Sequence, residues 1–84
     1  MNSIQERTLS VVRRLVDPRH RESLSAGSRL LEEKILDSLG LIQVVADLEG
    51  EFSISIETED LTLQNFNTVH DMAALVERMV ARQQ

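Results

Sequence analysis

The sequence predicts an all-α fold, arranged as a small four-helix bundle of 84 residues. Apolar residues recur at helical spacing in three segments, at about residues 3–16, 38–52 and 69–80. Residues 53–56 alternate between polar and apolar side chains, but the sequence offers no second strand to pair with them. Hydrophobic residues make up 42% of the chain, which suffices for one modest core. We therefore expect a single domain over residues 1–84.

The first helix is expected at residues 3–16. Its apolar stripe consists of Ile4, Leu9, Val11, Val12, Leu15 and Val16, with Thr8 in the same row. Asp17 and Pro18 end this helix, because the residue before a proline is pushed out of the helical conformation. Basic residues cluster at this end: Arg13, Arg14, Arg19, His20 and Arg21. Their charge suits the negative end of a helix, and a role in binding a partner or a phosphate stays open.

A long connection follows at residues 17–36. A loop of this length without structure of its own is uncommon unless it is functional or held to the core. We expect leucine and isoleucine side chains to hold it there: Leu24, Leu30, Leu31, Ile35 and Leu36. One helical turn is expected within it, at residues 30–33.

The second helix is expected to run from Ser38 to Glu51 or Phe52. Its core-facing stripe is Leu41, Val44, Val45, Leu48 and Phe52. Ser38, at the start, has two readings. Its hydroxyl can cap the helix by accepting a hydrogen bond from a backbone N–H that lacks an intrahelical partner. Alternatively, Ser38 is the attachment point of a covalently bound cofactor.

A second face of this helix is also apolar. Leu39, Ile42 and Ala46 fall together on it, next to Ser38, and Glu49 adds a negative charge at its edge. An apolar strip with an acidic edge suits docking to a partner groove with a basic rim. The alternative is that the loop near the third helix covers these residues, Leu39 above all.

The remaining elements are expected in the following order. Residues 53–56 form an extended loop that turns Ile54 or Ile56 inward, and Thr58 caps a short helix at residues 59–61. Residues 62–67 form another connection, anchored in the core by Phe66. Thr68, with Asp71 three residues later, caps the last helix, which continues to about residue 80.

Composition and charge limit the function. The net charge of −5 is unevenly spread, because residues 1–21 are basic and the rest is strongly acidic. An acidic body disfavours nucleic-acid binding and favours partners with basic patches, although part of it is ordinary solvated surface. The chain has no cysteine and no apolar run of membrane-spanning length. Residues 1–6 do not read as a secretory signal, so we expect a cytoplasmic protein.

The sequence shows no catalytic or metal-binding apparatus. His20 and His70 are far apart and fit no metal-binding spacing, and the chain has only three glycines, which leaves no Walker loop. Asp37 beside Ser38 does not make a catalytic triad. We therefore expect no catalytic residue, no metal site and no enzyme activity.

One pattern spans most of the chain. It consists of Ile35-Leu36-Asp37-Ser38-Leu39-Gly40, Leu48-Glu49-Gly50-Glu51-Phe52, Ile56, Glu59-Asp60-Leu61 and Thr68-Val69. From about Ile4 to Met79 the chain resembles the phosphopantetheine-dependent carrier proteins. The resemblance implies the acyl-carrier-protein type of four-helix bundle, with a long first loop and a short third helix. It also implies a 4′-phosphopantetheine arm on Ser38, taken from coenzyme A, whose thiol holds an acyl or aminoacyl group as a thioester.

The resemblance further implies a set of partners. They are a phosphopantetheinyl transferase, an acyl- or aminoacyl-adenylating ligase, and downstream acyl-transferring enzymes. Asp37 is implied to help the transferase bind or position its magnesium ion. Gly40 stands where fatty-acid carriers tend to have an acidic residue, which favours a stand-alone D-alanyl or aminoacyl carrier over a fatty-acid or polyketide carrier. Gly50 stands where the family usually has an acidic residue, which leaves open how far the acidic recognition surface extends. The loop at Glu57 and Thr58 also departs from the family pattern, which often has a proline and an acidic residue there. We expect a monomer, because a carrier must dock repeatedly.

Two readings of another class remain. In one, the chain is an unmodified helical adaptor in which Ser38 is only a helix cap. In the other, it is a DNA-binding helix-turn-helix, which the acidic charge disfavours.

Overall fold

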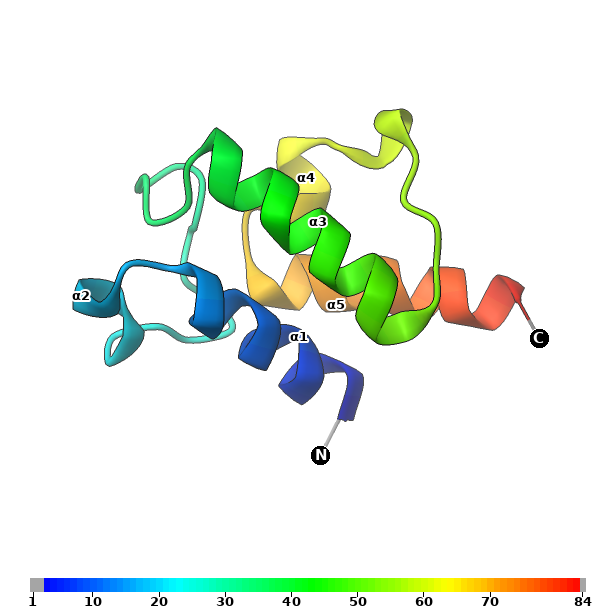
Figure 1. Ribbon diagram of the computed structural model, residues 1–84, viewed down its shortest axis with the longest axis horizontal. Helices are drawn as coiled ribbons and strands as arrows, with labels where there is room; N and C mark the ends of the chain where they lie inside the picture. The colour runs from blue at the N-terminus through cyan, green and yellow to red at the C-terminus, as the bar shows by residue number, and fades with distance from the viewer. Residues whose placement is uncertain (1–2, 84) are drawn as a thin grey trace.

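Regular secondary structure in the computed structural model is entirely helical over residues 3–83, the part of the chain that the structure describes. The elements are α1 (Ser3–Leu15), α2 (Pro18–Arg21), α3 (Ser38–Phe52), the 3-10 turn η1 (Thr58–Asp60), α4 (Leu63–Phe66) and α5 (Val69–Arg82). Helix α1 packs on α3 and α5, and α5 also contacts α3 and α4 (Figure 1). The predicted all-α bundle is confirmed. Met1 and Asn2, part of the expected signal-free N-terminus, lie outside the described residues, as does Gln84.

Helix α1 buries the stripe that the sequence predicts. Val11 and Val12 are fully enclosed, and Thr8 is buried beside them. The Thr8 hydroxyl donates a hydrogen bond to the carbonyl oxygen of Ile4 at 2.7 Å. This bond satisfies a polar group that would otherwise be costly in an aliphatic core.

The expected long connection contains a helix that the sequence analysis missed. Asp17 ends α1 and at once caps α2, because its Oδ1 accepts the backbone N–H of Arg19 at 2.9 Å. Pro18 occupies the first helical position, where its fixed φ is suitable and its missing N–H costs nothing. The pair Asp17-Pro18 therefore starts a helix as well as ending one.

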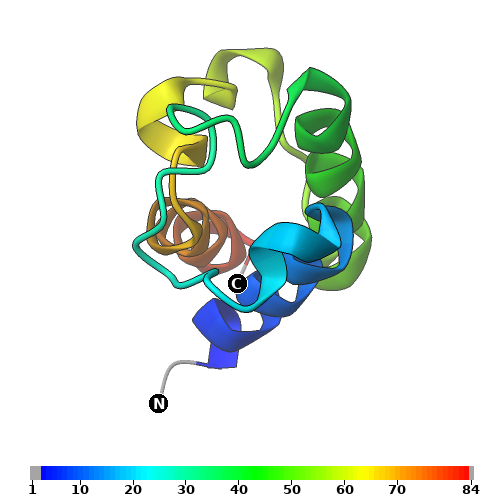
Figure 2. The ribbon, with the colours of Figure 1, turned by 90° about the vertical axis from the view of Figure 1, so that its left-hand side faces the viewer.

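The rest of this connection is held by Asn67, at the junction of α4 and α5. The carbonyl oxygen of Asn67 accepts the Leu30 N–H at 2.6 Å, and its side-chain oxygen accepts the N–H groups of Leu31 and Glu32 at 3.2 and 3.3 Å. Glu33 N–H donates to the Arg29 carbonyl at 3.0 Å, which makes the predicted helical turn. Figure 2 shows this loop crossing one end of the bundle before it enters α3.

Helix α3 is joined to α1 at its C-terminal end by Arg7. The Arg7 guanidinium lies 2.9 Å from the Glu51 carboxylate, donates to the Glu51 carbonyl oxygen at 3.0 Å, and sits 4.4 Å from the centre of the Phe52 ring. An exposed ion pair stabilises little by itself, about 0–1 kcal/mol. Stacking on the ring adds a further contact, so Arg7 fixes the far end of α3 against α1.

The segment between α3 and α5 contains two short turns. Ile54 is buried and Ile56 is half-buried, as predicted. Glu57, not Thr58, precedes η1, and the Glu57 N–H donates to the Asp60 carboxylate at 3.0 Å. The stretch 62–67, expected to be a connection, contains α4, which Thr62 caps by accepting the Asn65 N–H at 3.2 Å.

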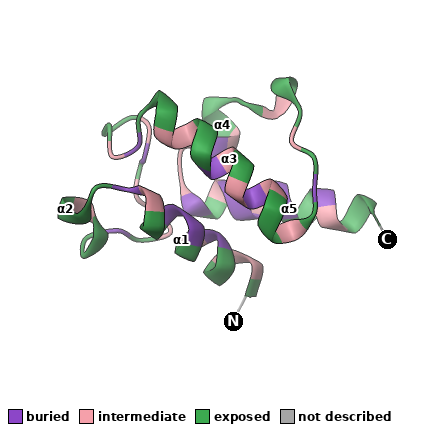
Figure 3. Ribbon diagram, in the orientation of Figure 1, coloured by how far each residue is buried: buried purple, intermediate pink, exposed green. Residues whose placement is uncertain are grey.

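Helix α5 completes the core. Thr68 caps it as predicted, because its hydroxyl oxygen accepts the Asp71 N–H at 3.0 Å. Its buried face meets the buried faces of α1, α3 and α4 (Figure 3). The largest fully buried side chain is Phe66 of α4, as the sequence analysis expected of this anchor. The aliphatic core thus gives α3 a fixed position with its outer face free.

Candidate functional site

Ser38 is the first residue of α3, and it is exposed at one end of the bundle. Its hydroxyl has no hydrogen-bond partner among residues 3–83. Figures 1 and 2 place this end of α3 at the same end of the molecule as α2 and the C-terminus of α1. The hydroxyl is therefore open to an incoming enzyme.

The cap of α3 is Asp37, which corrects the reading of Ser38 as the N-cap. Asp37 has extended backbone angles, and its Oδ1 accepts the Gly40 N–H at 2.7 Å. The Asp37 carbonyl oxygen accepts the Leu41 N–H at 2.8 Å. Both Asp and Ser are favoured caps, so their order alone could not distinguish them. Because Asp37 caps the helix, the Ser38 hydroxyl does not take part in capping.

Gly40 makes room for this cap. A Cβ atom at position 40 would lie 2.8 Å from Cδ1 of Leu36 and 3.2 Å from Oδ1 of Asp37. Leu36 is 3% exposed and belongs to the core, so it cannot easily move aside. The missing side chain therefore lets a core leucine and a capping carboxylate both come close to the backbone of Gly40. This requirement arises within the chain and is separate from the approach of any enzyme.

The second apolar face of α3 is open to solvent. Leu39 is 77% exposed and Ile42 is 66% exposed, and Ala46 is exposed as well. The alternative that a loop covers Leu39 is wrong. Leu39 and Ile42 therefore form an exposed pair of large aliphatic residues one turn apart, beside Ser38.

Glu49 has a different environment from the one the sequence suggested. One of its carboxylate oxygens accepts the backbone N–H of Ile56 at 2.8 Å, and the residue is half-buried. Glu49 therefore holds the loop after α3 while keeping its negative charge at the edge of the apolar face.

Two further large aliphatic residues, Leu61 and Leu63, are also exposed, at 45% and 52%. The sequence pattern assigned no role to either side chain.

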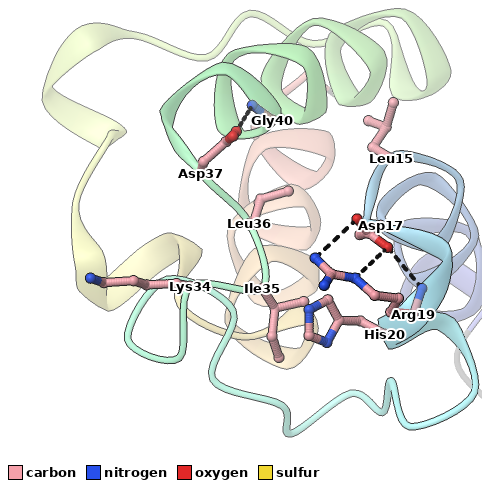
Figure 4. Close-up of a pocket in the computed structure, with 9 residues that line it drawn as sticks. All are labelled: Leu15, Asp17, Arg19, His20, Lys34, Ile35, Leu36, Asp37 and Gly40. Carbon is pink, nitrogen blue, oxygen red and sulfur yellow. Dashed lines mark hydrogen bonds and ion pairs between the residues drawn. The ribbon is translucent and has the colours of Figure 1, made fainter.

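A cavity of about 220 Å³ lies beside the start of α3. Its lining residues are Leu15, Asp17, Arg19, His20, Lys34, Ile35, Leu36, Asp37 and Gly40 (Figure 4). The three hydrogen bonds that Arg19 donates, first the one from its backbone N–H and then the two from its side chain, hold the pKa of Asp17 below its ordinary value. In Figure 4 the Lys34 side chain points away from His20 and from the Arg19–Asp17 pair, so Lys34 and Arg19 do not converge on one point.

The two histidines are not brought together into a catalytic or metal site. His20 lines the cavity just described, whereas Nδ1 of His70 lies 3.1 Å from the side-chain oxygen of Gln5. Within residues 3–83 there is no group of three or more side chains suited to hold a metal ion. In the same residues, no helix combines the length and the apolar character needed to cross a membrane.

Comparisons with known proteins point to one family. The sequence model of the phosphopantetheine attachment site matches residues 21–76. An acyl carrier protein of Phytoplasma australiense is 38% identical over 71% of this chain and 76% of its own length. A D-alanyl carrier protein of Lactococcus lactis subsp. cremoris is 40% identical over 57% of this chain, and the match spans 61% of that protein. A probable acyl carrier protein of a Serratia strain, PigG, is 34% identical over 73% of this chain and 70% of its own length.

Proposed function

This chain belongs to the family of proteins with a phosphopantetheine attachment site, and we propose that Ser38 is the residue to which the 4′-phosphopantetheine arm is joined. The protein is a carrier protein whose prosthetic group is 4′-phosphopantetheine. The observation that carries the proposal is the exposed Ser38 hydroxyl, which Asp37 relieves of the capping role. The phosphodiester formed there would lie at the positive end of α3, where an anion is stabilised.

The arm would supply the one chemical group that the chain lacks. There is no cysteine in the sequence, so no protein thiol can hold a cargo as a thioester. The thiol of the arm serves that purpose, while the chain's own residues present and orient it. Members of this family are carriers, and we propose that this chain has no enzyme activity of its own.

Asp37 is proposed to act twice. Oδ1 caps α3 through Gly40, whereas Oδ2 has no hydrogen-bond partner among the described residues. Oδ2 is thus available to help a phosphopantetheinyl transferase position its magnesium ion. A carboxylate oxygen is a ligand that magnesium prefers.

The partner-docking surface is proposed to be the outer face of α3, formed by Leu39, Ile42 and Ala46 with Glu49 at its edge. The exposed aliphatic side chains of Leu39 and Ile42 support this proposal. Its partners would be the transferase, an acyl- or aminoacyl-adenylating ligase and downstream acyl-transferring enzymes. Changing Leu39 and Ile42 to serine should weaken docking while leaving stability nearly unchanged, since surface substitutions usually stay within about 0.5 kcal/mol.

For the cargo we propose an aminoacyl group of the D-alanyl type, with an acyl group of the fatty-acid or polyketide type as the alternative. The support is Gly40, at a position where the family's fatty-acid carriers tend to have an acidic residue. A loading assay with D-alanine, other amino acids and fatty acids, each with its adenylating ligase, separates the two. Loading by fatty-acid ligases alone would refute the aminoacyl proposal.

We propose that residues 1–84 act as one carrier domain, as a monomer in the cytoplasm, without binding nucleic acid. The small described fold is consistent with a domain that passes between enzymes. Size-exclusion chromatography with light scattering tests the oligomeric state. A stable dimer at working concentration would contradict it.

The attachment site is tested by intact-mass spectrometry. The apo protein is incubated with coenzyme A, magnesium and a transferase of broad specificity, in parallel with Ser38→Ala and with Ser55→Ala, an exposed serine outside α3. We expect one phosphopantetheinyl group on the parent and on Ser55→Ala, and none on Ser38→Ala. If the Ser38→Ala variant were modified, the assignment of the attachment site to Ser38 would be overturned. If the parent were not modified while a control carrier was, the interpretation of the chain as an unmodified helical adaptor would be favoured instead.

A further inference from the structure

A second cavity, of about 400 Å³, lies at the C-terminal end of α1. Its lining residues are Ser10, Arg13, Arg14 and Arg21, and we name it the arginine pocket. We propose that the arginine pocket binds a phosphate-bearing ligand. Ser10, Arg13 and Arg14 precede residues 21–76, which the family model matches, so most of the pocket lies outside the attachment-site pattern.

The charge of the arginine pocket is not neutralised within the described chain. The ion pairs of residues 3–83 join Arg7 to Glu51, Arg19 to Asp17, and Arg29 to Glu32 and Glu33. Arg13, Arg14 and Arg21 take part in none of them, although the chain has more acidic than basic residues. Three guanidinium groups around one cavity repel one another, and an anion bound between them would relieve that repulsion.

The geometry of the pocket suits a phosphate. Nε of Arg21 donates to the Arg13 carbonyl oxygen at 3.2 Å, which holds the Arg21 side chain across the end of α1. The terminal nitrogens of Arg21 keep their own N–H donors, and the Ser10 hydroxyl adds another donor at the wall. Guanidinium groups present paired N–H donors that match phosphate oxygens, and they stay charged at all physiological pH values.

A structural role at the end of α1 explains only part of this arrangement. Cations favour a helix C-terminus, and the Arg21–Arg13 bond has that character. The same effect would not need three unpaired arginines around a hollow. Three unpaired guanidinium groups that line one exposed hollow suit an anion with several oxygens, such as a phosphate ester or a diphosphate.

The first test titrates the apo Ser38→Ala protein with inorganic pyrophosphate and follows amide and arginine side-chain NMR signals. Because this variant carries no attachment serine, the result is independent of the carrier assignment. We expect saturable shifts at Ser10, Arg13, Arg14 and Arg21 that weaken as salt is added. A parallel titration with sodium chloride at the same ionic strength is the control. Shifts that do not saturate, or that spread over all exposed arginines, would overturn the proposal.

Two double variants with the same charge change separate a site from general attraction. Arg13→Gln with Arg21→Gln removes two pocket cations, whereas Arg78→Gln with Arg82→Gln removes two exposed cations from α5. We expect the pocket variant to bind pyrophosphate at least about tenfold more weakly, the scale of one or two lost charged hydrogen bonds. The α5 variant should bind like the parent. Equal losses in the two variants would refute a defined pocket.

A vesicle assay distinguishes the source of the phosphate. The protein is sedimented with phosphatidylglycerol vesicles and with phosphatidylcholine vesicles, with and without competing pyrophosphate. Sedimentation with the anionic vesicles that is lost in the pocket variant identifies a lipid headgroup. Binding of pyrophosphate without sedimentation identifies a soluble phosphate ester. If the protein binds neither pyrophosphate nor the anionic vesicles, the proposal is overturned.

Discussion

The capping of α3 predicts opposite behaviour for the neighbours Asp37 and Ser38. Removing the Asp37 carboxylate leaves the Gly40 N–H without the 2.7 Å bond that it now makes. Loss of a helix cap costs about 0.5–2 kcal/mol, most often near 1 kcal/mol. Ser38 lies inside the helix with no side-chain hydrogen bond among the described residues, so replacing it with alanine, the best helix former, should leave stability unchanged or slightly higher.

The expected size of this difference is within reach of ordinary unfolding experiments. For a domain of this length, a loss of 1 kcal/mol lowers the melting temperature by about 4–8 °C. Asp37→Ala should therefore show a clear decrease in urea midpoint and melting temperature, measured by far-UV circular dichroism. Asp37→Asn keeps an accepting oxygen and should lose only the interaction of the charge with the helix end, about 0.3–1 kcal/mol.

The control is the equivalent cap of α5. Thr68→Ala removes the 3.0 Å bond to the Asp71 N–H and should cost about as much as Asp37→Ala, roughly 1 kcal/mol. Attachment of the arm, followed by mass, should survive Thr68→Ala, slow down in Asp37→Asn, and vanish in Ser38→Ala. If Ser38→Ala lost as much stability as Asp37→Ala, the assignment of the cap to Asp37 would be refuted.

Three further predictions concern packing and acid stability. Gly50→Ala should raise the free energy of unfolding by about 0.5–1 kcal/mol, because a Cβ atom there would meet open space. Gly40→Ala should lower it by about 1 kcal/mol net, because the added Cβ atom would press on Leu36. If urea unfolding showed both variants to be more stable than the parent, the close packing at Gly40 would be contradicted. Phe66→Ala should cost about 3–5 kcal/mol, and Phe66→Leu less than about 1.5 kcal/mol, so near-equal urea midpoints would disprove the role of Phe66 as core anchor. The pKa of Asp17 is lowered by hydrogen bonds from Arg19, so the stability contributed by its carboxylate is complete above pH 3.8, the ordinary value, and is lost as the pH falls through the folded-state value. Asp17→Asn should flatten that acid loss, and an NMR titration of the Asp17 carboxyl with a midpoint at or above 3.8 would contradict it.

The long helices could be predicted from sequence because each buries a continuous stripe. The periodicity of Val44, Leu48 and Phe52, and of Val69 to Met79, is imposed by packing against one core. The outer face of α3 was also visible, because Leu39 and Ile42 fall off that stripe. The sequence therefore predicted which residues form the second apolar face of α3, but it left open whether a loop covers them, and the structure shows that Leu39 is exposed.

The short elements could not be predicted in this way. Helices α2 and α4 have four residues each, too few to show a period. Their signals were local caps, Asp17-Pro18 and Thr62, which in sequence look the same as loop residues. Asp37 and Ser38 pose the same difficulty on a smaller scale, because both are favoured cap residues and they are adjacent. Only the backbone angles of Asp37 and its bond from the Gly40 N–H show which of them caps α3.

Asn67 gives the fold an order of completion. The N–H groups of Leu30, Leu31 and Glu32, just upstream of Ser38, bond to a residue that follows Ser38 by nearly thirty positions. A chain made from its N-terminus cannot close this contact until α4 has left the ribosome. In an unfinished or truncated chain, the loop that leads into Ser38 would therefore lack these three bonds, although α3 could already pack on α1.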